Sequence, residues 1–475
     1  MSYNNTKASY HGHGEPEPIG LEYLAGALAR AGFGCVFIGT SRLDVLDDCG
    51  HAKLALFSSS TDQYPRVLLE GKEARRGGLT TVIGGYHASG SSEEVARGPF
   101  DYVVQGEGEE VVVAIAQSVF RGDSTALAAY PHSRIESTTV IRAPRLSDLD
   151  AQAWPARSEE RLGTYVLYDL MWPPTSQQRN LAIVLGSRGC QYSCDFCASD
   201  TIWGRGVTKR SKENIVAELR DLKERFGTNT IVIIDQSFGQ DREWTLDLCR
   251  AIRQADLGLS WYHQSNLTIE RDVITAMADA GCTKIGFGLE GLSPSAVERI
   301  KSPNPASFDV INGLFDHCTS LGLFVKAYTI IGFPWETEDT VREYLHWLPQ
   351  LRANQVKISY MTPFPGTRYW DLYRDQLISR NWEDFDTVRM PVVRNPHIPV
   401  ARYHEIRESL FRTFYGSDNY TEGVRRMIAN HPRLTASYQE FAGFLDYFKL
   451  IGENEPWLAD VGYPHIKHPC PHTHH

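Results

Sequence analysis

Three cysteines lie close together in the segment GSRGCQYSCDFCASD, which spans residues 186–200. Cys190, Cys194 and Cys197 have the spacing C-x3-C-x2-C, and Phe196 precedes the last of them. A [4Fe–4S] cluster is normally held by four cysteine thiolates, so three thiolates leave one iron without a protein ligand. An open coordination position on a redox-active metal can bind a substrate or a cofactor. The spacing therefore favours a catalytic iron–sulfur cluster over a structural one.

Two other interpretations of these cysteines are a chance trio and a zinc knuckle that lacks one ligand. A structural zinc site usually takes four ligands, often as two separated pairs. The other cysteines are scattered singly, at Cys35, Cys49, Cys249, Cys282, Cys318 and Cys470. This scatter also predicts no disulfide framework. The last residues, HPCPHTHH, include metal-ligand residue types, but we expect a tail there rather than a metal site.

Strand-like and helix-like segments alternate through the middle of the chain. Strands are expected at 180–187, 229–235, 259–266, 283–290, 323–333 and 355–364, and helices at 211–227, 244–252, 270–281, 308–322 and 338–351. Such alternation predicts a parallel sheet, which with six repeats can curl into a partial barrel. The carboxyl ends of these strands are polar or glycine-rich, and parallel barrels carry their chemistry at those ends.

Several of these strand ends resemble motifs of the radical S-adenosylmethionine (SAM) superfamily. The cysteine loop with Phe196 is one, and IIDQSFGQD, GFGLEGLSP, IIGFPWETEDT and TPFPGT are the others. The resemblance implies a partial (β/α)6 barrel with a [4Fe–4S] cluster on Cys190, Cys194 and Cys197. SAM would bind the fourth iron, and one electron would cleave it to methionine and a 5′-deoxyadenosyl radical. That radical would remove hydrogen from the substrate.

The same resemblance implies a set of cofactor-binding residues. They are Phe196, Asp235, Gln236, Ser237, Ser265, Glu290 and Gly332. Three positions depart from the family pattern. Gln236 replaces a second acidic residue, so Asp235 and the Gln236 carbonyl would meet the amino group of SAM. Gly291 replaces a serine, and Asn266 stands where relatives often carry arginine.

The N-terminal region predicts a separate doubly wound α/β unit. Helices are expected at 19–34, 64–78 and 110–120, and strands at 35–39, 54–60, 79–89 and 101–109. Ligands of such folds bind at the carboxyl ends of the strands. The segments PIGLEYLAGAL, IGGYHAS and YVVQGEGEE resemble the cobalamin-binding domain that precedes the radical SAM core in one subclass.

The chain start argues against cobalamin in this domain. The first eighteen residues contain no apolar run of four, so no first strand is predicted there. His87 is outside a D-x-H-x-x-G motif, so a histidine-ligated cobalt is not expected, and we expect His87 at the surface. We therefore expect a degenerate domain that keeps the fold, does not bind cobalamin and acts as a lid.

These observations divide the α/β chain into four expected parts. They are a degenerate cobalamin-binding-like domain at 1–120, a linker at 121–180, the radical SAM partial barrel at 181–370 and a mostly helical region at 371–475. The last region is rich in Trp, Tyr and Arg. We expect it to close the barrel over the substrate.

Composition excludes several partners. The formal charge is −10, from 48 Lys and Arg against 58 Asp and Glu, and no basic cluster suggests nucleic-acid binding. No apolar run approaches the ~20 residues of a membrane span. The N-terminus has no signal-peptide pattern, so we expect a cytoplasmic protein.

The sequence favours a dehydration reaction. Without cobalamin or an auxiliary cluster, hydrogen abstraction would most simply be followed by loss of a hydroxyl from a vicinal diol. An acidic chain suits a cationic amino sugar, and the organisation resembles radical SAM diol dehydratases of aminoglycosides such as paromamine. The acid and base are unassigned, and an external one-electron reductant is needed. The alternatives are a cobalamin-dependent methyltransferase of a natural product and a non-catalytic sensor.

Overall fold

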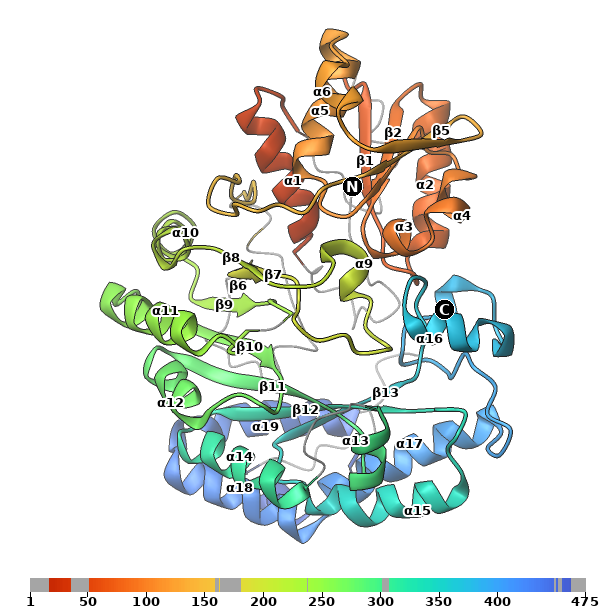
Figure 1. Ribbon diagram of the computed structural model, residues 1–475. Coiled ribbons are helices and arrows are strands. Elements are labelled where there is room, and N and C mark those ends of the chain that lie inside the picture. The colour runs from red at the N-terminus through yellow and green to blue at the C-terminus, as the bar shows by residue number, and fades with distance from the viewer. Residues whose placement is uncertain are drawn as a thin grey trace, which may run out of the picture.

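The computed structural model shows an N-terminal α/β domain above a second, larger sheet with its helices, and a helical C-terminal region (Figure 1). It describes residues 17–35, 51–158, 162, 181–236, 238–300, 307–447, 450–451 and 455–462. The expected strand at 35–39, the chain start and the HPCPHTHH segment lie almost wholly outside these residues. No helix of the described part is both long and apolar enough to cross a bilayer.

The N-terminal domain is doubly wound, as predicted. Its sheet has the order β1 (Leu54–Ser58), β2 (Thr80–Gly84), β3 (Tyr102–Gln105), β5 (Thr138–Arg142) and β4 (His132–Ile135). All pairs are parallel except β4–β5. One face packs on α2 (Tyr64–Arg76) and α4 (Ser92–Ala96), and the other on α5 (Glu109–Arg121), beside α1 (Ile19–Arg30). The β4–β5 hairpin, which follows α6 (Thr125–Ala128), was not expected.

The strand expected at 79–89 is shorter than predicted. β2 stops at Gly84 because Gly85 turns the chain with φ +93°, and α3 (Tyr86–Gly90) follows. A side chain at position 85 would place a Cβ 2.8 Å from the Ser59 nitrogen. The turn therefore requires glycine.

His87 is buried, so the expectation of a surface position is wrong. Its ring is 0% exposed and lies 4.3 Å from the Tyr64 ring and 5.0 Å from the Trp382 ring, centre to centre. Burial lowers the pKa of His87 to about 3. His87 is buried because the Trp382 ring, from the C-terminal region, packs on it where it projects from α3.

The second sheet has six parallel strands in sequence order, which confirms the predicted radical SAM architecture. They are β6 (Leu181–Val184), β9 (Thr230–Ile233), β10 (Ser260–Ser265), β11 (Cys282–Glu290), β12 (Phe324–Ile331) and β13 (Gln355–Tyr360). The connecting helices are α10 (Lys212–Phe226), α11 (Arg242–Ala255), α12 (Arg271–Asp279), α14 (Phe308–Ser320) and α15 (Glu338–Trp347), together with the unpredicted α13 (Pro294–Ile300).

Helix α10 shows how local sequence sets these elements. The Ser211 side chain accepts a hydrogen bond from the Asn214 N–H at 3.1 Å, which caps the helix start. Gly227 ends the helix in the left-handed region at φ +64°. Between them Ile215, Leu219 and Leu222 form a buried stripe on the core, as the helical spacing predicted.

The C-terminal region is helical, as expected. It contains α16 (Arg368–Tyr373), α17 (Val400–Tyr415), α18 (Asp418–Asn430), α19 (Thr435–Tyr447) and α20 (Pro456–Asp460). α17 to α19 lie beneath the sheet in Figure 1. Tyr438 of α19 packs on Phe324, at the amino end of β12. Its hydroxyl oxygen accepts a hydrogen bond from Asn354 Nδ2 at 2.7 Å, directly before β13.

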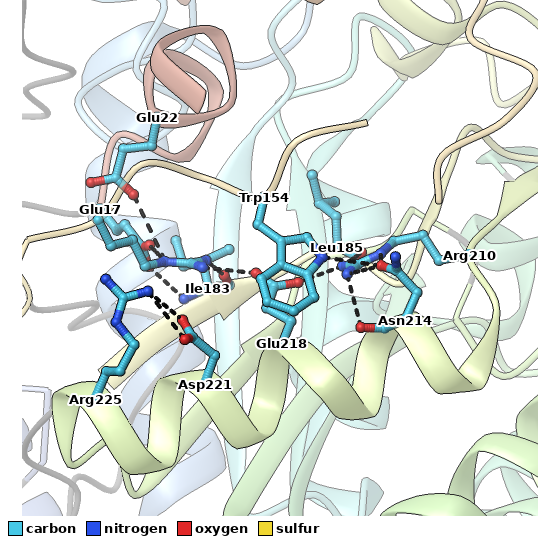
Figure 2. A network of polar contacts seen from close by, with 11 residues as sticks. Glu17, Glu22, Trp154, Ile183, Leu185, Arg210, Asn214, Glu218, Asp221 and Arg225 are labelled. Carbon is cyan, nitrogen blue, oxygen red and sulfur yellow. Dashed lines mark hydrogen bonds and ion pairs between the residues drawn. The ribbon is translucent and has the colours of Figure 1, made fainter. Parts of the chain in front are cut away.

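A buried ionic network covers the free edge of β6 (Figure 2). Glu17 accepts the Ile183 N–H, and Arg157 donates to the Ile183 carbonyl. Arg210 donates to the Leu185 carbonyl at 3.0 Å.

Glu218 joins the two arginines of this network. Its Oε1 lies 2.7 Å from Arg157 Nη1, and its other oxygen accepts from Arg210. Burial acts to raise the pKa of Glu218, but the two guanidiniums hold it below its ordinary value. Side chains from three segments of the chain therefore bind the backbone of Ile183 and the Leu185 carbonyl at this edge.

Candidate active site

The cysteine loop leaves β6 and carries three thiols, none of which forms a disulfide with another described cysteine. Cys190 and Cys194 are half-buried, and the Cys197 N–H donates to the Cys194 carbonyl at 3.0 Å. Desolvation raises the pKa of the Cys197 thiol to about 11, and the nearby Cys194, Cys190 and Glu290 add to the shift. The three sulfurs therefore share one region at the carboxyl end of the sheet.

These thiols fit three corners of a [4Fe–4S] cluster. They come from one loop, none is in a disulfide, and thiolate is the ligand that such clusters take. In the described part of the chain no three His, Cys, Asp or Glu side chains converge on a point where one metal ion could sit. Cluster ligands bind different iron atoms, so they need no such convergence.

The first end of the loop is held by Asp235 and Gln236. Asp235 Oδ1 accepts the Gly186 N–H at 2.7 Å, and Oδ2 accepts the Ser187 hydroxyl at 2.6 Å. Gln236 Oε1 accepts the Gly189 N–H at 3.1 Å. Asp235 is 2% exposed, and burial raises its pKa to about 7 despite these bonds. Both side chains thus point at the backbone of the cysteine loop.

Arg145, from the connector, holds the same end. Its guanidinium donates to the Arg188 carbonyl at 3.0 Å and to the Gly206 carbonyl at 2.8 Å. The Gly206 N–H in turn donates to the Cys190 carbonyl at 3.0 Å. Gly189 has φ +87°, and a Cβ there would lie 2.3 Å from the Gly206 oxygen. Glycine is therefore required directly before Cys190.

This end is further ordered by a short strand pair. β7 (Ser187–Arg188) pairs antiparallel with β8 (Thr208–Lys209), and α9 (Ser199–Trp203) lies between them in sequence. Arg145 Nε also donates to the Thr208 hydroxyl at 2.9 Å. The first cysteine is thus fixed by contacts on both sides of the loop.

The second end of the loop contacts α16 and β11. The Tyr369 N–H donates to the Asp195 carbonyl at 2.9 Å, and the rings of Phe196 and Tyr369 lie 6.3 Å apart. Glu290 ends β11 and is 9% exposed. Its charge adds to the raised pKa of both Cys197 and Tyr369, after the larger effect of burial. The structure therefore brings Phe196 and Glu290 to the cysteines.

Glu290 and its neighbour have unusual backbone environments. Glu290 has φ +66°, a left-handed conformation that costs a non-glycine residue energy and recurs at functional sites. A Cβ at Gly291 would lie 2.4 Å from the Val297 nitrogen, at the start of α13. This close approach explains why the family's serine is absent here.

The turn after β12 is held by a buried carboxylate. Gly332 has φ +93°, and its N–H donates to Glu336 Oε2 at 2.7 Å. Glu336 also accepts the hydroxyls of Tyr344 at 2.9 Å and Tyr403 at 2.8 Å. It is 0% exposed, and burial raises its pKa to about 7.

One predicted residue is not brought to the cysteines. The Ser265 hydroxyl donates to the Phe238 carbonyl at 3.0 Å, on the face of β10 that carries Trp261 and packs on the helices. Ser237 lies outside the described residues.

The inner face of the sheet carries lysines. The side chains of Lys284, Lys326 and Lys357 alternate with core-facing residues of β11, β12 and β13, so they point to this face. Lys284 donates to Gln355 Oε1 at 3.2 Å, and the Lys326 ammonium lies 4.8 Å from the Tyr328 ring centre. Glu290 is the acidic residue of this face within the described strands. These charges give no support to a cationic amino sugar.

The carboxyl edge of the N-terminal sheet faces the cysteine loop (Figure 1). Small or polar residues follow its strands: Ser59 after β1, Gly85 after β2 and Gly106 after β3. A Cβ at Gly106 would lie 3.4 Å from the Ile202 oxygen of α9. Gln63 Nε2 is buried at this edge, and no described residue accepts a hydrogen bond from it. Small residues at the strand ends leave room for a large ligand, and the Gln63 amide could donate a hydrogen bond to it. Cobalamin, which is large and carries amide side chains, fits such an edge.

Sequence comparison agrees with this division of the molecule. Residues 184–348 match the radical SAM superfamily, and residues 11–116 match the B12 binding domain. The chain therefore combines a radical SAM domain with a preceding B12-binding domain.

The chain is also similar to individual proteins, several of which are named methyltransferases. An uncharacterized methyltransferase, PH0819, from Pyrococcus horikoshii is 27% identical over 348 residues, which cover 70% of this chain and 72% of that protein. The bacteriochlorophyllide d C-12(1)-methyltransferase of Chlorobaculum tepidum is 24% identical over 78% of this chain and 76% of its own length. The methyltransferase TsrM from Kitasatospora setae, solved with cobalamin and a [4Fe–4S] cluster, has a TM-score of 0.61 at 20% identity, over 76% of this chain and 72% of that one.

Two expectations are corrected by these findings. The expectation that cobalamin is not used is contradicted by the match to the B12 binding domain and by the cobalamin-bound structural relative. Dehydration of an amino-sugar diol is contradicted by relatives that are named methyltransferases. The error came from treating an unpatterned chain start as a missing strand, whereas the B12-binding match begins at residue 11.

Sequence reasoning missed the arginines and carboxylates that hold the loops. Arg145, Arg188, Glu107 and Glu336 were given no role, although YVVQGEGEE was noted as a motif. The signal available for Glu107 was its place at the carboxyl end of a strand. No local pattern indicated its partner.

Proposed function

We propose that this chain is a cobalamin-dependent radical SAM methyltransferase that acts on a small molecule. The observation that carries the proposal is the placement of the B12-binding edge of the N-terminal sheet over the cysteine loop. Relatives named as methyltransferases support the reaction type. We also propose the chain divisions at residues 120, 180 and 370.

The chain's residues have distinct tasks in this proposal. Cys190, Cys194 and Cys197 hold the cluster, and Phe196 and Glu290 contribute to the SAM site beside them. When bound, the cluster supplies the electron that cleaves SAM, and cobalamin carries the methyl group.

Other predicted residues shape this site by holding its loops. Asp235 and Gln236 fix the start of the cysteine loop, and Glu336 fixes the turn at Gly332. Ser265 fixes the segment after β9. An external one-electron reductant is still required, because each reductive cleavage of SAM consumes one electron that the chain's own residues do not supply.

Anaerobic reconstitution with iron, sulfide and hydroxocobalamin tests the proposal. After desalting, the visible spectrum should show stoichiometric retention of cobalamin. With reductant and SAM, mass spectrometry should find S-adenosylhomocysteine only in the cobalamin-loaded protein, and 5′-deoxyadenosine in both preparations. Cys197→Ala is the matched control and should form neither.

Two results of this reconstitution would overturn the proposal. One is loss of cobalamin on desalting. The other is a rate of S-adenosylhomocysteine formation that does not depend on cobalamin. A small-molecule product made with deuterated-methyl SAM should carry the labelled methyl group, and a product without the label would also contradict methyl transfer.

A further inference from the structure

An arginine of the cysteine loop reaches into the B12-binding domain. Arg188 lies two residues before Cys190, and its Nη1 is 2.8 Å from a carboxylate oxygen of Glu107. Its Nη2 is 2.7 Å from a carboxylate oxygen of Glu109. The three side chains are 6%, 2% and 8% exposed, so this is a buried contact between two domains.

The N-terminal domain encloses the guanidinium from a third side. The ring centre of Tyr23, from α1, lies 4.7 Å from the guanidinium carbon of Arg188. An arginine over an aromatic face gains a further attraction when it is shielded from water. The planar fork of arginine serves two carboxylates at once, which the single ammonium of lysine cannot do in the same way.

Arg188 and Glu107 are also bound to two adjacent residues of the linker between the domains, Arg145 and Leu146. Glu107 Oε2 accepts the Leu146 N–H at 2.8 Å, so both of its oxygens are engaged. The adjacent residue, Arg145, donates to the Arg188 carbonyl at 3.0 Å. The backbone of Arg188 is therefore bound by Arg145, and its side chain is connected through Glu107 to the next residue, Leu146.

These contacts connect the carboxyl end of β3, in the B12-binding domain, with the start of the cysteine loop. Glu107 lies two residues beyond the carboxyl end of β3, where ligands of doubly wound domains bind. Arg188 directly precedes the Gly189–Cys190 turn. A buried ion pair is a poor source of stability, because apolar residues could hold the same interface at less desolvation cost. Its directional bonds instead fix a geometry.

We propose that Arg188 is a positioning residue that sets the distance between the cluster loop and the ligand edge of the B12-binding domain. The proposal rests on the proposed function, because that edge is taken to hold cobalamin. Misplacement by about 1 Å at a reacting centre can cost about 100-fold in rate. Arg188 thus acts through the loop, without touching the reacting atoms.

The test uses Arg188→Met, Arg188→Lys and Glu107→Gln in the fully reconstituted protein. Pulsed electron paramagnetic resonance measures the dipolar interaction between cob(II)alamin and the reduced cluster. Wild type should give one defined interaction, and Arg188→Met should weaken or broaden it while iron and cobalamin content stay unchanged. Arg188→Lys, which keeps the charge, should fall between them.

Kinetics and hydrogen exchange give two further readouts. In Arg188→Met, formation of S-adenosylhomocysteine should fall about 100-fold, while formation of 5′-deoxyadenosine should stay near wild type. Amide exchange should increase at residues 186–190 and 105–109 together. Arg205→Met is the matched control, because Arg205 belongs to the same loop region but its side chain is 78% exposed. It should behave as wild type.

The outcomes separate this inference from the proposed function. If Arg188→Met keeps both cofactors and shows the wild-type dipolar interaction, the positioning role is wrong and the methyltransferase proposal stands. If wild type does not retain cobalamin, the proposed function fails, and the exchange measurement decides the link between domains. Unchanged exchange in Arg188→Met and Glu107→Gln would then overturn it.

Discussion

The two ends of the cysteine loop are held in different ways. At the first end, Asp235, Gln236 and Arg145 hydrogen-bond to the backbone between residues 186 and 206. At the second end, Tyr369 contributes one backbone bond to Asp195 and a ring contact. The first cysteine therefore depends on the sheet and the connector, and the last two depend on α16.

This difference predicts that substitutions at the first end of the loop destabilise the protein more than substitutions at the second end. At the first end Asp235 is buried, and Gln236 and Arg145 are half-buried, so loss of Asp235 leaves a buried backbone N–H unsatisfied. The ion pair at the second end, between Arg368 and Asp195, is 3.5 Å long and its side chains are 70% and 37% exposed. Exposed pairs of this kind contribute little. Four predictions test the contrast, from the largest effect to the smallest.

The cysteines at both ends should be equally essential. Cys190→Ala, Cys194→Ala and Cys197→Ala should each abolish reductive cleavage of SAM, because a cluster with two thiolates is not retained. Iron content and 5′-deoxyadenosine formation measure the effect. Cys35→Ala is the control at an exposed cysteine outside the loop and should match wild type. Full activity of any loop variant would contradict the cluster assignment.

The turn after β12 is a third loop held by a buried side chain, Glu336, and its contribution to stability should depend on pH. Burial raises the pKa of Glu336 from 4.5 to about 7. Between these values the folded protein keeps the proton and the unfolded chain releases it. The free energy of unfolding should therefore fall by up to about 3 kcal/mol as pH rises through this window, and be flat above it.

Glu336→Gln isolates this contribution. The free energy of unfolding of wild type and variant is measured in urea at about pH 5 and about pH 8. Relative to the variant, wild type should be less stable at the higher pH than at the lower one. Other titrating groups cancel in that difference. An equal difference at both pH values would show that Glu336 is ionised throughout.

At the first end, Asp235→Ala should cost about 1–3 kcal/mol in the free energy of unfolding, because the buried Gly186 N–H loses its acceptor. Asp235→Asn should cost less, since an amide oxygen can still accept that N–H. Ser187→Ala removes a single side-chain bond and is the matched comparison. Chemical denaturation of the cluster-free protein measures all three, and equal stability of the Ala variant would refute the anchoring role.

At the second end, Arg368→Met should change the unfolding free energy by less than about 1 kcal/mol. Cluster content and SAM cleavage should stay at wild-type levels. A large loss would mean that the exposed ion pair matters as much as the buried contacts, and the contrast between the two ends would disappear.

Much of the radical SAM domain could be predicted from sequence. Periodicity within α10 and the alternation of segments predicted its helices, its strands and their parallel arrangement, because each signal is local. The Arg188–Glu107 pair could not be predicted, since its members lie 81 residues apart and no spacing rule relates them. The burial of His87 likewise depends on Trp382, from another part of the chain.

The cobalamin expectation failed for a different reason. It depended on not finding an apolar run in the first eighteen residues, and the lack of a local pattern is weak grounds for removing a strand. The glycine-rich and polar strand ends at Ser59, Gly85 and Gly106 were present in the sequence. They carried the positive signal for a ligand at that edge.

The network at β6 has a consequence for dissecting the protein. Glu17 and Arg157 satisfy the backbone of Ile183, and both precede the radical SAM strands in the chain. A fragment that begins at residue 181 would lose these partners and leave Glu218 facing only Arg210. Its first strand would then be open to pairing with a second molecule, so excising the catalytic half should yield oligomers rather than a monomeric enzyme.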